Sequence, residues 1–407
     1  MLKMSALLAG SENRRFVLTR ASSTGLALFL ALLYTKVLGI DKRSVLAFVM
    51  TASLIATIAL TSGISLTYRK NISKGENAKN LDAYLALVLF LSGFVAVIST
   101  GMLAIYSQIQ TSIPSTLYII CFLYSFLASI NFGYQDALLA NAHLKAATTL
   151  DLATIVIQSV VCLLLFAINI TSLIVSVFLA FIFSYLLITS LTLLNLRSVL
   201  NIEWPTLWTR IWKMAQESRH NYLYGIANGL ADRVDRLIIG LILPIGYLAK
   251  YSLMSSLIMY TRFLPDALSK LSLMSEHARN KLSEQLKGWR MLLSVGIIAC
   301  GIAGLAELFI YLVFGRVWLL PLAVPFFFAL QEVCRGYYQI GTARLIAHGA
   351  EKSVARTSLA LIGLSLVAIS GATYLLGVSG APLSMIFIYS FLIFRIKHIA
   401  GASSSGQ

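Results

Sequence analysis

Charged residues are scarce in this sequence: Asp, Glu, Lys and Arg together make up 12% of it, whereas hydrophobic residues make up 58%. About a quarter of the residues of an ordinary soluble domain are charged, and a soluble fold with so little charge would not stay in solution. Several uncharged runs reach the ~20 residues that a helix needs to cross a bilayer. The composition therefore excludes a water-soluble domain and predicts an all-α integral membrane protein.

Residues that bind metals or form disulfides are also few. The five histidines lie in loops or at the ends of apolar runs, without the spacing of metal ligands. The four cysteines fall singly inside apolar runs, where each reads as a small buried hydrophobe; they are Cys121, Cys162, Cys300 and Cys334. We therefore expect no metal, no disulfide and no cofactor. The N-terminus is basic, but no small-residue cleavage site follows a short apolar core, so we expect an uncleaved first span.

Acidic residues number 16 and basic residues 32, which gives a formal net charge of +16. No basic block or basic face points to a nucleic-acid partner. Instead, Lys and Arg recur in alternate loops, and the positive-inside rule places such loops in the cytoplasm. The basic side holds the N-terminus, residues 68–80, Lys145, and the segments 197–219, 270–290 and 344–356. On the other side we expect Lys42, Arg43 and Arg316 as outer-loop charges, and the loops 107–115, 168–172 and 377–382 carry none. We therefore expect both termini in the cytoplasm.

The apolar pattern predicts about 12 transmembrane helices. They are expected near 16–39, 44–67, 83–106, 116–140, 150–168, 171–195, 220–243, 246–269, 290–314, 317–340, 354–377 and 380–396. The longest connection divides the chain into an N-terminal half (1–200), a linker (201–219) and a C-terminal half (220–407). Six spans in each half give both halves the same orientation, which predicts a parallel pseudo-twofold repeat. Residues 38–55 resemble residues 243–258, and each segment joins the first span of its half to the second.

The linker contains a stripe of apolar residues at helical spacing. The stripe consists of Trp204, Leu207, Trp208, Ile211, Trp212 and Ala215. Pro205 suits the first turn of a helix. The pattern predicts a short helix that lies in the headgroup region of the membrane, and a linker packed on the protein core is the alternative.

The segment ADRVDRLIIG (231–240) places four charges within five residues of an apolar span. One charged side chain at the centre of a span costs roughly 2.5–3.5 kcal/mol on insertion scales, so four cannot face lipid. At helical spacing Asp232, Arg233, Asp235 and Arg236 share one side of the helix, and apolar residues cover the other. Two interpretations stay open. Either internal ion pairs neutralise one another between packed helices, or a hydrated central cavity offers both arginines to an anionic substrate.

Further charges lie within the expected spans, basic and acidic in equal number, so only their arrangement could create an anion site. Arg262 and Asp266, and likewise Glu332 and Arg335, are spaced for ion pairs on one helix. Asp136 and Glu307 have no partner nearby in the sequence. Each is therefore a candidate for a coupling step or for an ion pair across helices.

A chain of twelve spans in two six-helix halves, with basic inner loops, resembles the Wzx-type polysaccharide flippases. Their superfamily also holds the peptidoglycan lipid II flippases and the multidrug MATE antiporters. The local resemblance is in residues 229–257, where such proteins show an Asp, a Leu/Ile/Gly run, a Gly-Tyr loop and a Tyr-Ser start to the next span. Here these are Asp235, residues 237–240, Gly246-Tyr247 and Tyr251-Ser252. The LGI at 38–40 is also similar, but the DKRS at 41–44 departs from the small or aromatic loop that usually follows.

The resemblance implies a MATE-like V-shaped bundle in a bacterial inner membrane, and a transporter and not an enzyme. Such proteins move an undecaprenyl-pyrophosphate-linked oligosaccharide, for example an O-antigen unit of lipopolysaccharide, from the cytoplasmic to the outer leaflet. Guanidinium groups suit pyrophosphate because they stay charged and bind it bidentately. We therefore expect Arg233 and Arg236 to contact the headgroup, with Arg262 and Arg335 as weaker candidates. The expected supporting or coupling residues are Asp232, Asp235, Asp136 and Glu307.

Membrane lipid and the lipid-linked oligosaccharide are the expected partners, together with a polysaccharide polymerase, a chain-length regulator and a coupling ion (H+ or Na+). A cation-coupled multidrug antiporter of the same fold is the nearest alternative, since Asp136 and Glu307 would suit it. A polymerase or glycosyltransferase is disfavoured because the outer loops are short and uncharged and no loop of suitable size carries an acidic pair. An auxiliary membrane subunit is a third possibility, against which the polar side of residues 231–240 argues.

Overall fold

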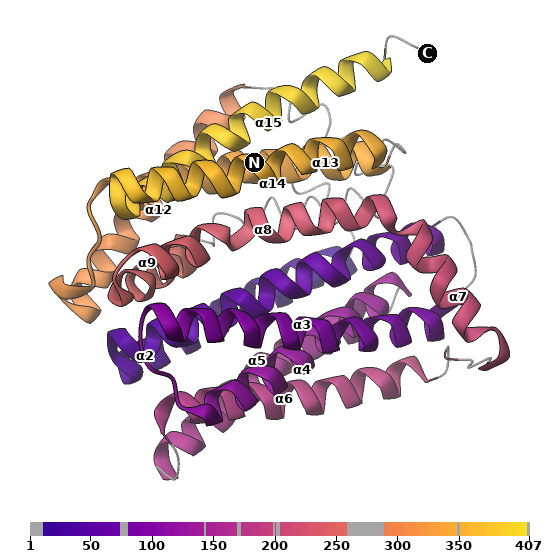
Figure 1. The fold of residues 1–407 in the computed structure, drawn as a ribbon, viewed down its shortest axis with the longest axis horizontal. Helices are drawn as coiled ribbons and strands as arrows, with labels where there is room; N and C mark the ends of the chain where they lie inside the picture. The colour runs from indigo at the N-terminus through magenta and orange to yellow at the C-terminus, as the bar shows by residue number, and fades with distance from the viewer. Residues whose placement is uncertain are drawn as a thin grey trace. The chain divides into compact units, whose positions relative to one another are not determined.

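We describe a computed structural model, in which residues 11–73, 80–141, 144–168, 172–197, 200, 204–258, 289–347 and 351–404 are placed. These residues form α-helices joined by short connections (Figure 1). In chain order the first helices are α2 (Ser11–Ser73), α3 (Leu81–Ile109), α4 (Ser115–Ala140), α5 (Leu144–Ile168), α6 (Leu173–Leu196) and α7 (Trp204–Glu217). The others are α8 (Arg219–Ile242), α9 (Ile245–Ile258), α12 (Trp289–Phe314), α13 (Ala323–Ala347), α14 (Glu351–Leu376) and α15 (Gly380–Ser404).

Within the described residues, 7 helical segments are long and apolar enough to cross a membrane. Two of them, Ser22–Ile72 and Ser353–Ile396, each contain two of the expected spans. The eighth expected span is described only over Ile245–Ile258. The segments therefore indicate a multi-pass membrane protein, and the count of twelve spans stays a prediction.

Two departures from the expected helix boundaries lie at glycines. The spans expected at 16–39 and 44–67 are joined without a loop, because only Gly39 leaves the helical conformation, with a φ of 72° that glycine adopts easily. The tenth helix was expected from residue 317 but begins at Ala323. Before it, Gly315 ends α12 with a φ of 85°, and Arg316–Trp318 form one 3-10 turn.

The chain divides into two compact units, Met1–Arg233 (unit 1) and Val234–Gln407 (unit 2). In unit 1, α2 packs on α3, α4 and α5, and α6 packs on α4 and α5. In unit 2, α13 and α14 pack on α15, while α12 packs on α9 and α13. The boundary falls inside α8, because the first part of this helix packs on unit 1. The division into 1–200, 201–219 and 220–407 stays a prediction.

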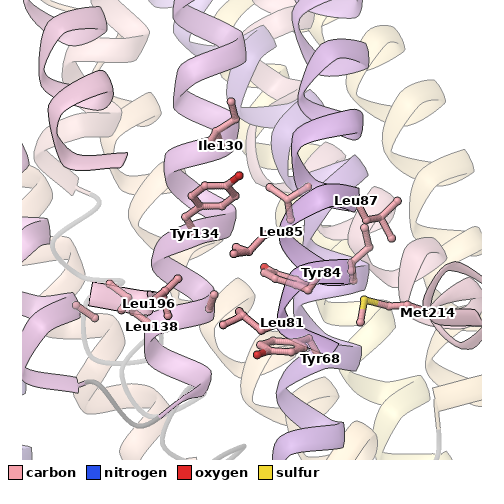
Figure 2. Close-up of a cluster of buried hydrophobic side chains, with 14 of the residues drawn as sticks. Tyr68, Leu81, Tyr84, Leu85, Leu87, Ile130, Tyr134, Leu138, Leu196 and Met214 are labelled. Carbon is pink, nitrogen blue, oxygen red and sulfur yellow. The ribbon is translucent and has the colours of Figure 1, made fainter. Parts of the chain in front are cut away.

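The core of unit 1 is a cluster of buried tyrosines and aliphatic side chains from α2, α3, α4, α5, α6 and α7. Figure 2 shows part of it, with Tyr68 and Tyr84 among the leucines of α3 and α4. The ring centroids of these two tyrosines lie 4.5 Å apart in a stacked arrangement. Met214 belongs to the same cluster, so α7 is part of the packing of unit 1.

Helix α7 runs across the direction of α3 at one end of unit 1 (Figure 1). Its Arg210 donates two hydrogen bonds, of 2.8 and 2.7 Å, to the buried carboxylate of Asp82 at the start of α3. The three tryptophans of the predicted stripe point away from the core: Trp204 and Trp208 are each 74% exposed and Trp212 is 62% exposed. One side of the helix therefore packs on unit 1 while the tryptophans are exposed, and its position in the headgroup region stays a prediction.

Candidate functional site

Glycines allow α8 to approach the second part of α2 closely within unit 1. A Cβ atom on Gly63 would lie 2.7 Å from the backbone of Tyr222, and one on Gly225 would lie 2.4 Å from the Ser62 hydroxyl oxygen. On Gly229 it would lie 3.1 Å from the backbone of α2. Nearer the start of α8, the Asn221 side chain donates a 2.9 Å hydrogen bond to Thr67 of α2. This packing fixes the rotation of the first part of α8 within unit 1, up to Arg233.

Arg233 is the last residue of unit 1 and is half-buried. Its positive charge acts on the hydroxyl of Tyr34, a buried residue of α2. The first of the two predicted headgroup arginines therefore lies near the N-terminal part of α2, on the α8 helix that the glycines hold in place.

A second arginine acts on the same tyrosine. Arg43 of α2 is 3% exposed, and its Cζ atom lies 5.0 Å from the centroid of the Tyr34 ring. Its Nε donates a 2.9 Å hydrogen bond to the Thr35 hydroxyl. Among the described residues, no carboxylate forms an ion pair with Arg43. From the sequence this residue was expected to be an outer-loop charge, so its burial was missed.

The environment of Arg43 is energetically unusual. Burying an ion costs several kcal/mol in a real protein, and a desolvated cation–π contact returns about 2 kcal/mol. A hydrogen bond from a charged group adds roughly 1.5–3 kcal/mol. The contacts to Tyr34 and Thr35 thus offset part of the penalty without neutralising the charge. The signal in the sequence was the departure DKRS at 41–44, directly after the glycine that kinks α2.

Aromatic side chains continue from Tyr34 into the interior of unit 1. The ring of Tyr34 meets that of Phe181 edge-on, with centroids 6.4 Å apart. Tyr124 packs on Phe181 at 5.8 Å and on Tyr185 at 6.0 Å. Tyr185 also hydrogen-bonds with Tyr124 and Gln158. Apolar faces and polar edges of this kind suit sugar rings as well as ordinary packing.

In unit 2, Asp235 and Arg236 of α8 are both buried. The Asp235 carboxylate accepts a 2.6 Å hydrogen bond from the hydroxyl of Tyr251 in α9 and a 2.8 Å hydrogen bond from the backbone N–H of Arg236. The two motif residues Asp235 and Tyr251 are therefore in direct contact. The ring of Tyr251 also packs edge-on against Phe328 of α13, with centroids 5.4 Å apart.

Helix α13 supplies another pair of charges. Arg335, only 1% exposed, lies 4.0 Å from the carboxylate of buried Glu332, as the spacing of the two residues predicts. The charges of Glu332 and Asp235 both act on the hydroxyl of Tyr251. Since the removal of one partner from a buried pair typically costs about 3–5 kcal/mol, we expect the loss of either Glu332 or Arg335 to destabilise unit 2.

The remaining predicted residues are distributed as follows. Asp136 of α4 forms an ion pair with Arg69 of α2, across helices. Glu307 of α12 is partly buried, and its Oε2 makes no hydrogen bond within the described residues. The side chain of Asp232 and the whole of Arg262 lie outside the described residues. Among the residues that the structure describes, no group of three or more His, Cys, Asp or Glu is arranged to hold a metal.

No protein-family model and no curated protein sequence matches the chain. Solved structures do. A eukaryotic MATE transporter, AtDTX14, aligns with a TM-score of 0.68 and 13% identity over 94% of each chain. The lipid II flippase MurJ in an inward closed conformation aligns with a TM-score of 0.67 and 13% identity over 95% of this chain and 87% of its own. A mutant of the MATE transporter VcmN of Vibrio cholerae gives a TM-score of 0.65 and 14% identity over 98% of this chain and 99% of its own. The chain therefore has the fold that MATE transporters share with the lipid II flippase.

Proposed function

We propose that this protein is a flippase that moves an undecaprenyl-pyrophosphate-linked oligosaccharide from the cytoplasmic to the outer leaflet of a bacterial inner membrane. The observation that carries the proposal is the presence of guanidinium groups inside an apolar helical fold like that of the lipid II flippase. Arg233 is half-buried in unit 1, whereas Arg236 and Arg335 are buried in unit 2. A pyrophosphate needs such groups, because its negative charge cannot cross the hydrocarbon core of a membrane without cationic partners.

The arginines differ in what binding an anion requires of them. Arg335 lies 4.0 Å from the Glu332 carboxylate, so it must exchange this contact for one with the ligand. The charge of Arg233 acts on the hydroxyl of Tyr34, whose ring also contacts Arg43, so two guanidinium groups share one region of unit 1 and match the two phosphates of a pyrophosphate. We therefore assign Arg233 the leading role in holding the headgroup. The assignments of Arg236, Arg335 and Arg262 as further contacts stay proposals.

Transport would follow alternating access through a polar cavity, with the isoprenoid chain remaining in lipid. In this proposal both termini face the cytoplasm and the two halves form a parallel repeat. The orientation is supported by the basic loops at 68–80 and 270–290 and the uncharged ones at 107–115 and 377–382. The carried glycan is proposed to be a lipopolysaccharide component such as an O-antigen unit, handed to a polymerase with its chain-length regulator.

A cation-coupled multidrug antiporter is the second candidate function. Glu307 favours it, because a partly buried carboxylate oxygen without a hydrogen bond in the described residues is suited to taking up a proton. MATE transporters with the same fold support this alternative. It predicts drug efflux that Glu307→Gln abolishes, whereas a flippase requires no drug efflux at all.

The proposal is tested by mass spectrometry of lipids extracted from the native host, from its deletion strain, and from strains restored with wild-type, Arg233→Ala or Arg236→Ala protein. We expect undecaprenyl-linked oligosaccharide to accumulate in the deletion strain. Wild-type protein should clear it, and Arg233→Ala should fail to do so at equal expression. Unchanged lipid-linked sugars in the deletion strain would remove the flippase function and leave the antiporter as the better candidate.

A further inference from the structure

Arg43 belongs to the segment DKRS, where the sequence departs from the pattern of the flippases that it resembles. The two residues before it, Asp41 and Lys42, are exposed, whereas Arg43 turns into unit 1 and is almost completely buried. The kink at Gly39 makes this possible, since it changes the direction of α2 four residues earlier. The arginine that the sequence places in an outer loop is therefore a buried charge in the structure.

The guanidinium of Arg43 retains most of its binding capacity. It carries five N–H donors in a planar fork, and within the placed ranges of the chain only Nε donates a hydrogen bond, to Thr35. The Tyr34 ring covers one face of the guanidinium, which leaves its edge for an oxyanion. Because no described carboxylate pairs with Arg43, an anion would not have to displace one.

Two positive charges act on one tyrosine hydroxyl in this region, those of Arg43 and Arg233. A single carboxylate, as in an acidic sugar, would pair with only one of these arginines. A diphosphate carries several charged oxygens and can pair with both. The aromatic rings of Tyr34 and Phe181 then lie beside the site, where a sugar ring attached to the diphosphate would follow.

We propose that Arg43, held in place by Tyr34 and Thr35, forms an oxyanion subsite in unit 1 that binds the diphosphate of the transported lipid. The inference rests on the proposed function and assigns its substrate a contact on α2. The alternative is a structural role, in which Arg43 ties the two parts of α2 together across Gly39 through its hydrogen bond to Thr35.

The two roles predict opposite effects on the empty protein. Replacement of an unpaired buried charge by the neutral donor glutamine should raise the melting temperature, because the penalty of burying the charge disappears. If Arg43 is a structural tie, the same change should lower the melting temperature. Lys42→Gln is the matched control, since it removes the same charge from the exposed neighbouring residue.

The experiment measures binding of undecaprenyl diphosphate to the purified full-length protein in detergent by native mass spectrometry, with neutral undecaprenol as the reference lipid. We expect Arg43→Gln to weaken diphosphate binding roughly 10- to 100-fold, to leave undecaprenol binding unchanged, and to raise the melting temperature. Lys42→Gln should behave like wild-type protein. Arg43→Lys should bind at an intermediate level, because it keeps the charge but loses the fork.

Equal diphosphate binding by wild-type and Arg43→Gln protein would overturn the subsite while leaving the proposed function intact. If wild-type protein prefers diphosphate no more than undecaprenol, both the subsite and the proposed function fail. Competition with free pyrophosphate and with glucuronate identifies the recognised group. If glucuronate competes in an Arg43-dependent manner and pyrophosphate does not, the assignment to the diphosphate is wrong.

Discussion

The close contact between α2 and α8 makes Gly63→Ala an informative perturbation. A Cβ atom at this position would lie 2.7 Å from both the N and the Cα atoms of Tyr222 and 2.9 Å from the carbonyl carbon of Asn221. All three are backbone atoms, so no side chain can rotate away to make room. The two helices must therefore separate or rotate by several tenths of an ångström at least.

Overpacking of this kind typically costs about 1–3 kcal/mol. In a domain of 150–250 residues, each kcal/mol lowers the melting temperature by about 2–4 °C, so a loss of several degrees is expected for unit 1. Arg233 follows Tyr222 by eleven residues on α8, which is about three helical turns. A shift of α8 at Tyr222 therefore also displaces this arginine relative to Tyr34. We therefore expect Gly63→Ala to reduce transport by more than the loss of folded protein explains.

The assay compares thermal unfolding in detergent and clearance of lipid-linked oligosaccharide in the deletion strain. Gly93→Ala is the matched control, because the same methyl group on α3 would meet nothing within 4 Å. In a helix interior Ala is favoured over Gly by about 0.5–1 kcal/mol, so this variant should be as stable as wild type or more so. If Gly63→Ala and Gly93→Ala melt alike, the described packing of α8 on α2 is wrong.

Three further changes test the charged and hydroxyl groups. Tyr251→Phe removes the 2.6 Å hydrogen bond to the buried Asp235 carboxylate, so thermal unfolding should show a loss of roughly 1.5–3 kcal/mol in stability. Tyr247→Phe, at a more exposed site, should leave the stability unchanged. Arg210→Ala removes the guanidinium that donates two hydrogen bonds to the buried Asp82 carboxylate at the start of α3. It should weaken the packing of α7 on unit 1 by about 3–5 kcal/mol, which limited proteolysis would detect. Lys213→Ala, on the same helix but exposed, should have no such effect. Glu332→Gln removes the carboxylate that lies 4.0 Å from the buried guanidinium of Arg335 in unit 2, so folded yield on size-exclusion chromatography should fall, and a normal yield would contradict the stabilising role of this pair.

Much of the fold was predictable because the signals are local. Apolar runs of span length identify helices wherever they occur, and the spacing of Glu332 and Arg335 predicts their pair. The extra length of α2 was not predictable, since a loop and a kink at Gly39 differ by a single backbone conformation.

The direction of polar side chains was much harder to predict. The Arg69–Asp136 pair joins residues 67 positions apart, and no sequence pattern links them. Arg43 looked like an outer-loop charge because burial depends on neighbours from other parts of the chain, here Tyr34 and the aromatic residues behind it. The sequence shows that span seven carries two acids and two arginines, but it does not show which helix they face. The packing of Gly225 and Gly229 on α2 indicates where Arg233 lies.

The linker shows the same limit on a smaller scale. Helical spacing placed its apolar residues on one stripe, but the structure divides that stripe between two surroundings. Ile211 and Ala215 pack against the core of unit 1, whereas Trp204, Trp208 and Trp212 are exposed. Helical periodicity predicts that one side of a helix is apolar, but it does not predict whether protein or lipid covers that side.

The most direct test of the central claim is the sidedness of the lipid-linked oligosaccharide in the deletion strain. Intact spheroplasts and inverted membrane vesicles would be treated with a membrane-impermeant reagent that oxidises sugars, and the labelled lipids measured by mass spectrometry. The account predicts that the lipid-linked sugar is labelled only in inverted vesicles when the protein is absent or carries Arg233→Ala, and is labelled in spheroplasts when wild-type protein is restored. Equal labelling in spheroplasts with and without the protein would show that the oligosaccharide crosses the membrane by another route and would contradict the flippase.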